Sequence, residues 1–218
     1  MLFDNNLPLL IFDLDGTLID SAADIHLALN QMLAKYNCSS VDFPTLVSHI
    51  GDGLTKLIHD FFPEYPINSS GNIEKVNEFL TIYETNIVLH TRLYPGVLDF
   101  LQNYNGAKAI ITNKNILPAI AILKHFSLHD LPWVDIIGGD SLAERKPSPL
   151  PLRHVMKKAN FTPPNTWMIG DGRPDMQSGH AAGCIKVAVH YGYSTPEELN
   201  IYEPNHILKN FSDLKRLF

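Results

Sequence analysis

The sequence is poor in the residues that mark several classes of protein. Its 218 residues include two cysteines, and its 17 lysines and arginines are outnumbered by 23 acidic residues. Two cysteines without a C-x-x-C spacing are too few for a disulfide scaffold, so we predict free thiols at Cys38 and Cys184. The formal charge of −6 argues against a surface that binds nucleic acid.

Long hydrophobic runs and targeting signals are also missing. Residues 1–6 contain no lysine or arginine, and the apolar run at 7–12 is too short to cross a membrane. We therefore expect no signal peptide, no membrane partner and a cytoplasmic protein. With 45% hydrophobic and 18% charged residues, the composition is that of a globular protein with a sizeable core.

Apolar spacing divides the chain into an alternating part and a helical part. Residues 9–12 form a short apolar run, typical of a buried parallel strand. Apolar residues then recur at helical spacing, as at Ile25, Leu29 and Met32. The residues from 21 to 90 are predicted to be purely helical, with helices near 25–36, 54–62 and 76–87. Residues 68–72 are predicted to form a turn-rich loop between two of them.

From residue 94 onward, predicted helices and strands alternate. The strands are expected at 107–112, 134–137, 166–169 and 185–189, and the helices at 97–104, 117–125, 150–159 and 175–182. Repeated βα units imply a parallel sheet with helices on both faces. We predict an α/β fold: a doubly wound, Rossmann-like core of residues 1–20 and 91–218, interrupted by a helical insert at 21–90.

Polar residues of a consistent kind follow four of the predicted strands. They are Asp13-Leu14-Asp15-Gly16-Thr17-Leu18, Thr112-Asn113-Lys114, Lys146-Pro147 and Gly170-Asp171-Gly172-Arg173-Pro174-Asp175. Open parallel sheets bind ligands at the carboxyl ends of their strands, so these groups are expected to meet. Neighbouring carboxylates repel unless a cation lies between them, and Mg²⁺ prefers oxygen ligands. Moving a phosphoryl group requires a nucleophile, charge neutralisation and proton transfer, all of which this set can supply.

In this order, the four motifs resemble the signature motifs of the haloacid dehalogenase superfamily, and the resemblance covers the whole core. The insert is similar to the cap domain of the phosphoglycolate-phosphatase-like branch. Further matches are Leu18-Ile19-Asp20-Ser21, Ile50-Gly51-Asp52-Gly53 and Tyr94-Pro95-Gly96-Val97. The resemblance implies a Mg²⁺-dependent phosphatase that acts on a small phosphorylated metabolite, with phosphoglycolate as the leading substrate. We expect a monomer or a homodimer.

The resemblance also implies roles for the acidic residues. Asp13 would be the nucleophile that forms an aspartyl-phosphate, and Asp15 would act as general acid and then as general base. Asp13, the backbone carbonyl of Asp15 and Asp171 would hold Mg²⁺. Asp175 would be a further ligand or a neighbour of the ligands, although an aspartate here can also favour the start of a helix.

Other matching residues would hold the substrate. Thr112 and Asn113 would bind the phosphate, and Lys146 would neutralise both Asp13 and the transferred group. Gly51 and Asp52 would belong to a loop that faces the substrate. A nearby lysine, Lys56, could meet a carboxylate or face solvent.

Other functions share these motifs. Phosphomutases on this scaffold carry a cap histidine ten residues after the second aspartate, where this chain has Ile25. The adjacent His26 is displaced by about 100° around a helix, so the match fails. The dehalogenases lack the second aspartate, supplied here by Asp15. A non-catalytic module that only binds a phosphorylated ligand is the remaining alternative.

Overall fold

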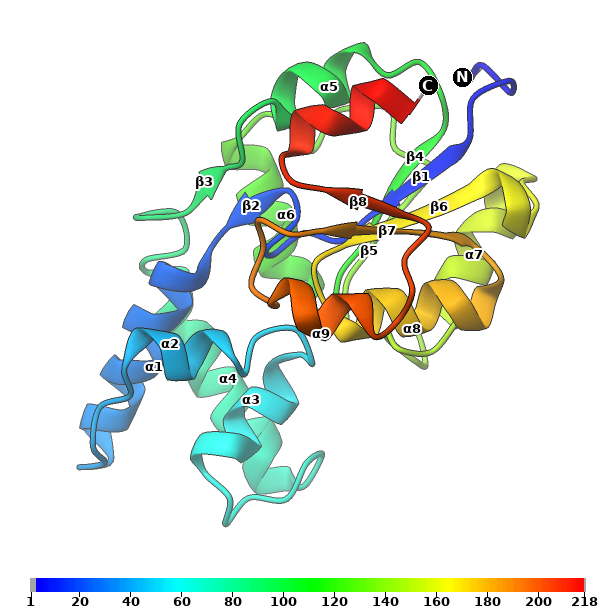
Figure 1. Cartoon of the computed structure of the whole chain (residues 1–218). Coiled ribbons are helices and arrows are strands. Elements are labelled where there is room, and N and C mark those ends of the chain that lie inside the picture. The colour runs from blue at the N-terminus through cyan, green and yellow to red at the C-terminus, as the bar shows by residue number, and fades with distance from the viewer. Residues whose placement is uncertain (1–2, 218) are drawn as a thin grey trace.

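A six-stranded parallel sheet places the carboxyl ends of its strands together at one end of the sheet (Figure 1). The computed structural model of the chain describes residues 3–217. The strands are β1 (Leu9–Phe12), β4 (Lys108–Ile111), β5 (Ile136–Ile137), β6 (Thr166–Gly170), β7 (Ile185–Val189) and β8 (His206–Leu208). Their order is β5-β4-β1-β6-β7-β8, and every neighbouring pair is parallel. The predicted parallel sheet is thereby confirmed.

The sheet grows outward from β1 in two directions. β4 and β5 lie on one side of β1, and β6, β7 and β8 lie on the other. The helix directly before β4 and the helix between β6 and β7 pack on opposite faces of the sheet. A crevice for ligands is expected at such a switch point, at the carboxyl ends of β1 and β6.

Helices cover both faces because the strands alternate their apolar side chains. Leu10 and Phe12 of β1 belong to one buried cluster, and Leu9 and Ile11 belong to another. The first cluster includes residues of α5 (Val97–Asn103), α6 (Ile116–His125) and the 3-10 helix η2 (Phe211–Leu217). The second includes residues of α7 (Leu150–Ala159) and α8 (Arg173–Ala182). This arrangement confirms the doubly wound α/β fold.

The structure adds elements that the apolar pattern does not reveal. Among them are β8, α9 (Pro196–Asn200), the 3-10 helix η1 (Pro163–Asn165) and two short strands, β2 (Ile19–Asp20) and β3 (Arg92–Leu93). Each of these has five residues or fewer, which is too short for a periodic signal. The strand expected at 134–137 is also shorter than predicted, because β5 pairs with β4 only through Ile136 and Ile137.

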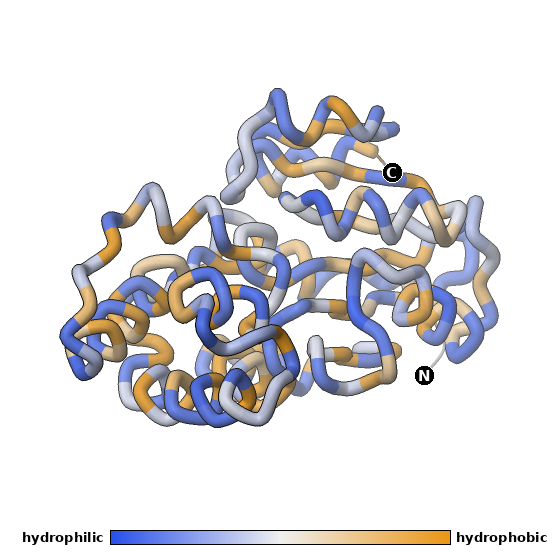
Figure 2. The backbone as a smooth tube through the Cα atoms, turned by 90° about the horizontal axis from the view of Figure 1, so that it is seen from below, coloured by the Kyte–Doolittle hydropathy of each residue, from blue (hydrophilic) through white to orange (hydrophobic). Residues whose placement is uncertain are grey.

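Four helices occupy residues 21–90 and pack around a hydrophobic cluster of their own. They are α1 (Ala22–Lys35), α2 (Phe43–Val47), α3 (Leu54–Phe61) and α4 (Ser70–Glu84). Figure 2 shows hydrophobic and hydrophilic residues interleaved along the helices, as expected when each buries one face. The prediction of a turn-rich loop at 68–72 is wrong in part, because α4 begins at Ser70, inside that range. The Ser69 side chain caps this helix by accepting a hydrogen bond from the Asn72 backbone N–H.

The predictions about the two cysteines and about membrane-spanning segments can be compared with the structure. Cys38 is exposed, Cys184 is buried, and both are free thiols. Among the helices of residues 3–217, none combines the length and the apolar character needed to traverse a bilayer.

Asp24 joins the start of α1 to the chain that returns from the helical segment. Its carboxylate is fully buried and accepts hydrogen bonds from the backbone N–H groups of His90 and Thr91 and from the Thr91 hydroxyl. Just outside this contact, β2 pairs antiparallel with β3. Asp24 therefore fixes the two connections side by side.

Replacing Asp24 with alanine should lower the free energy of unfolding by about 3 kcal/mol, because buried donors lose a charged acceptor. Chemical denaturation would measure this loss. Asp99→Ala is a matched control, since Asp99 is 62% exposed and pairs with Lys215 at the surface. This control should change stability by about 0.5 kcal/mol or less. Equal losses in the two variants would contradict the role given to Asp24.

Candidate active site

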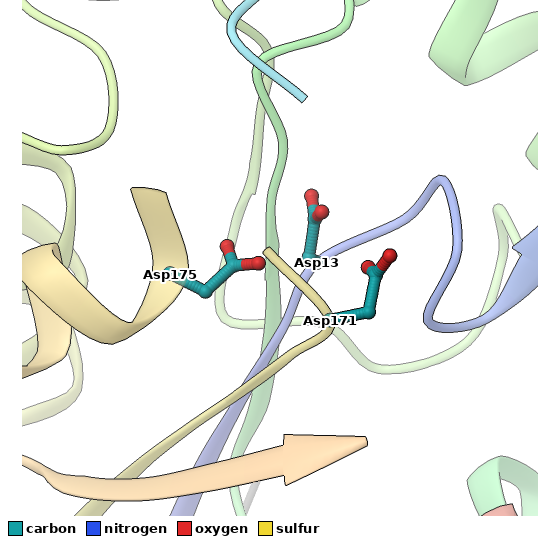
Figure 3. Close-up of side chains that lie close together, drawn as sticks. All are labelled: Asp13, Asp171 and Asp175. Atoms are coloured by element: carbon teal, nitrogen blue, oxygen red, sulfur yellow. The ribbon is translucent and has the colours of Figure 1, made fainter. Parts of the chain in front are cut away.

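Three carboxylates meet at the carboxyl ends of β1 and β6 (Figure 3). Asp13 follows β1, Asp171 follows β6, and Asp175 lies in the first turn of α8. One oxygen from each residue lies within 4.8 Å of the others. The chain can turn here because Gly16 adopts a φ of +80°, and a Cβ on it would lie 2.1 Å from Asp171 Oδ2.

Neutral donors hold two of these carboxylates in place. Asp171 Oδ1 accepts from the Thr17 hydroxyl at 2.9 Å, and Oδ2 accepts from the Tyr193 backbone N–H at 2.8 Å. Asp175 Oδ2 accepts from the Gly172 backbone N–H at 3.0 Å, which is a helix-start contact. The two interpretations of Asp175 are therefore compatible, since the same side chain caps α8 and faces the cluster.

Lys146 is the cation beside the three carboxylates, and it is 2% exposed. Its Nζ lies 2.8 Å from Asp13 Oδ1 and 2.6 Å from Asp175 Oδ1. It also donates to the Ile111 carbonyl at 2.6 Å. Within residues 3–217, this ammonium group is the ionic partner of the buried Asp13 Oδ1, and no other donor reaches that oxygen.

Burial and like charge dominate the electrostatics of the cluster. Burial, the Asp175 charge and a smaller effect of Asp15 raise the pKa of Asp13 to about 7, although Lys146 opposes the shift. Burial and the charges of Asp13 and Asp175 also raise the pKa of Asp171 well above its ordinary value. A divalent cation among these oxygens would favour their ionised forms. The donor set therefore fits a metal ion that prefers oxygen ligands.

Thr112 and Asn113 follow β4 and are both buried beside the cluster. The Thr112 hydroxyl oxygen accepts from the Lys114 backbone N–H at 3.1 Å, which leaves its own hydrogen free to donate. The Asn113 amide donates to the carbonyls of Gly51 and Lys146, each at 2.9 Å. Asn113 thus joins the loop after α2 to the lysine of the site.

Asp15 lies beyond the cluster and has a cationic partner that the motifs do not assign. Lys114 Nζ lies 3.1 Å from Asp15 Oδ1 and 3.3 Å from Oδ2. The Ser21 hydroxyl also donates to this carboxylate. Lys114 was visible in the sequence as the residue after Thr112-Asn113, but nothing local indicated that its side chain would be buried beside Asp15.

A pocket that is continuous with solvent lies between these residues and the helices of residues 21–90. Gly51 and Gly53 line it. Asp52 instead faces Arg173, whose Nη2 lies 2.6 Å from Asp52 Oδ1 at the surface. Lys56 is 39% exposed and pairs with Asp60, so the structure does not bring its charge into the pocket.

Known proteins resemble this chain in sequence. A phosphoglycolate phosphatase from Neisseria meningitidis is 36% identical over 192 residues, which cover 84% of this chain and 80% of the relative. A phosphoglycolate phosphatase from Colwellia psychrerythraea is 34% identical over 218 residues, which cover 94% of both chains.

Solved structures resemble the fold. The crystal structure of a predicted phosphoglycolate phosphatase from Haemophilus somnus matches with a TM-score of 0.86 and 27% sequence identity, over 98% of both chains. A family model described as haloacid dehalogenase-like hydrolase matches residues 10–189, from β1 to β7 and through all four motifs. As the motifs predicted, the chain belongs to the haloacid dehalogenase-like hydrolase family.

Proposed function

We propose that this protein is a Mg²⁺-dependent phosphatase that hydrolyses a small phosphomonoester, with phosphoglycolate as the leading substrate. The observation that carries the proposal is the cluster of Asp13, Asp171 and Asp175, which line a pocket, with the buried Lys146 paired to two of them. Such a group combines a nucleophile with the charges needed to hold a phosphate. The names of the relatives support phosphoglycolate as substrate.

Asp13 is the proposed nucleophile. Its carboxylate oxygen attacks phosphorus, a new O–P bond forms, and the bond from phosphorus to the leaving oxygen breaks. Asp15 donates a proton to that leaving oxygen and later takes one from the water that hydrolyses the aspartyl-phosphate. Lys146 lies 2.8 Å from Asp13 and offsets the negative charge that gathers during attack.

The proposed Mg²⁺ ligands are Asp13, Asp171 and the backbone carbonyl of Asp15. When bound, Mg²⁺ would neutralise negative charge on the carboxylates and on the phosphoryl group. Asp175 already pairs with Lys146 through Oδ1 and caps α8 through Oδ2. We therefore propose that it borders the metal site and holds Lys146 in place.

Two residues of the second motif take different parts in this scheme. The Thr112 hydroxyl has a free hydrogen and is the proposed donor to the phosphate. Both amide hydrogens of Asn113 are used by Gly51 and Lys146. Asn113 therefore acts mainly by fixing these two partners around the phosphate.

Residues 21–90 are the proposed cap over a core of residues 1–20 and 91–218. Their separate hydrophobic cluster and the β2–β3 pair at their two connections support this division. The cap contacts the core through Asn113 and Gly51, and through Arg145, which donates to the Thr55 hydroxyl at 2.9 Å. Covering the pocket in this way would exclude water from the first chemical step.

The phosphomutase alternative finds less support. Ile25 lines the pocket at the position where the mutases carry histidine. The ring of His26 packs edge-on against Phe43, with centroids 5.5 Å apart, and its Nε2 lies 2.8 Å from the Val41 carbonyl oxygen. His26 is thus engaged within the helical segment. The complete set of charged residues also favours an enzyme over a module that only binds a phosphorylated ligand.

The proposal predicts that the purified protein with Mg²⁺ releases inorganic phosphate from phosphoglycolate. Phosphate release from a panel of phosphorylated metabolites, with kcat/KM for each, would measure this activity. Phosphoglycolate should rank first, and a generic chromogenic ester should be cleaved more slowly. Conversion of a sugar phosphate to its isomer would favour a mutase instead. Absence of phosphate release from every ester would overturn the proposed function.

A further inference from the structure

Lys114 is a buried cation in the pocket that the scheme above does not use. Its side chain is 8% exposed, and in the described part of the chain its ammonium hydrogen bonds go to Asp15. An ammonium group has three donors, so capacity remains for another acceptor. Lys114 also lines the pocket together with Asp15.

Tyr83 provides a second, independent sign of a ligand at this place. The residue is 2% exposed, and its ring lies 4.8 Å from Lys114 Nζ, measured to the ring centroid. Its hydroxyl is buried near Lys114 and makes no hydrogen bond of suitable geometry within residues 3–217. A buried hydroxyl without a partner is destabilising, and a ligand in the pocket can remove that cost by accepting its hydrogen bond.

The two lysines of the site lie on different sides of the reaction centre. Lys146 contacts Asp13, the proposed nucleophile, and so lies on the side where the phosphate would bind. Lys114 contacts Asp15, the proposed donor to the leaving oxygen, and so lies beside the leaving group. Around Lys114 and Tyr83, the pocket wall is apolar, which strengthens a charge interaction there. That wall includes Ile25, Leu54, Leu57, Phe79 and Leu80.

We infer that Lys114 and Tyr83 form a subsite for a carboxylate on the leaving group. This inference rests on the proposed function and narrows its substrate class to phosphorylated hydroxy acids. The carboxylate accepts hydrogen bonds from Lys114 Nζ and from the Tyr83 hydroxyl, while the apolar wall contacts the carbon chain. Substrate choice then depends on Lys114 from the core and Tyr83 from α4, rather than on Asp52 or Lys56.

The test compares two esters of similar size, phosphoglycolate and 2-hydroxyethyl phosphate, in which a neutral hydroxymethyl group replaces the carboxylate. The measured quantity is the ratio of their kcat/KM values, because any general damage to catalysis affects both esters and cancels. In Lys114→Met, the ratio should shift against phosphoglycolate by about 10- to 100-fold. In Tyr83→Phe, it should shift the same way by roughly 3- to 10-fold.

Matched controls carry the same substitutions outside the pocket. Lys56→Met removes a lysine that pairs with Asp60, and Tyr36→Phe removes a hydroxyl that bonds to Glu78. Neither should change the ratio. If Lys114→Met does not fold, Tyr83→Phe still decides the question through its own ratio.

The outcomes separate this inference from the function on which it rests. Equal loss for both esters in Lys114→Met, with an unchanged ratio in Tyr83→Phe, would overturn the subsite and leave the phosphatase standing. If the wild-type protein cleaves neither of these esters nor any other ester of the panel, the proposed function fails. In that case, calorimetric titration of the Asp13→Asn variant with each ester tests the subsite. The subsite requires that adding Lys114→Met to this variant weakens the binding of phosphoglycolate more than the binding of 2-hydroxyethyl phosphate.

Discussion

Asp13→Asn should lower kcat by about 10⁴-fold or more, since the amide is a poor nucleophile and removal of a principal catalytic group has effects of this order. The variant should stay folded. Asparagine has nearly the shape of aspartate, and the change removes a negative charge from a buried cluster in which Asp175 and Asp13 repel each other. Steady-state kinetics would measure the loss, and circular dichroism with thermal unfolding would verify the fold.

The covalent step can be observed directly. Acid quenching during turnover, followed by borohydride reduction and peptide mass spectrometry, should find the acyl-phosphate on Asp13 alone. Asp130→Asn is the matched control, because the Asp130 side chain is 96% exposed. It should retain the wild-type kcat. A near-normal kcat in Asp13→Asn would contradict the covalent mechanism.

Removing divalent metal should lower activity at least about 100-fold, and Mg²⁺ should restore it, because the cation offsets the charge of several carboxylates and of the phosphate. Excess chelator followed by titration with Mg²⁺ would measure this dependence. Ca²⁺ should restore less activity, since its larger and looser shell holds the reacting groups less well. Full activity in excess chelator would contradict the proposal.

A second readout needs no turnover. Binding of Mg²⁺ to the folded protein should raise the free energy of unfolding by about 2.7 kcal/mol at 100 times Kd, and the Tm should rise accordingly. Asp171→Asn should abolish this rise without lowering the Tm of the metal-free protein, because it also relieves repulsion from Asp13 and Asp175. Asp130→Asn should show the full rise. A normal rise in Asp171→Asn would remove Asp171 from the ligand set.

Much of the fold could be predicted from local patterns. The strand before Asp13 is visible because Leu9 to Phe12 are all apolar and buried on both faces of the sheet. The limits of the prediction are equally physical. β2 and β3 have two residues each and form only because the two connections meet, held by Asp24. Contacts between residues 24 and 91 leave no trace in the spacing of either segment.

The sequence by itself determined the α/β order, the helical insert and the motifs that place Asp13, Asp171 and Asp175 after strands or at a helix start. These features depend on local periodicity and on the rule that parallel strands present their carboxyl ends together. The family followed from the same motifs.

Only the tertiary structure decided which partners these side chains have. The resemblance implied that Lys146 would neutralise Asp13, but only the fold shows that its Nζ is buried between Asp13 and Asp175. Lys114, just after β4, and Tyr83, on α4, come from different segments, yet both line one pocket, with Lys114 Nζ 4.8 Å from the centroid of the Tyr83 ring. Burial and charge pairing depend on distance in space, so the sequence could name the acidic cluster but could not show that Lys114 is buried beside Asp15.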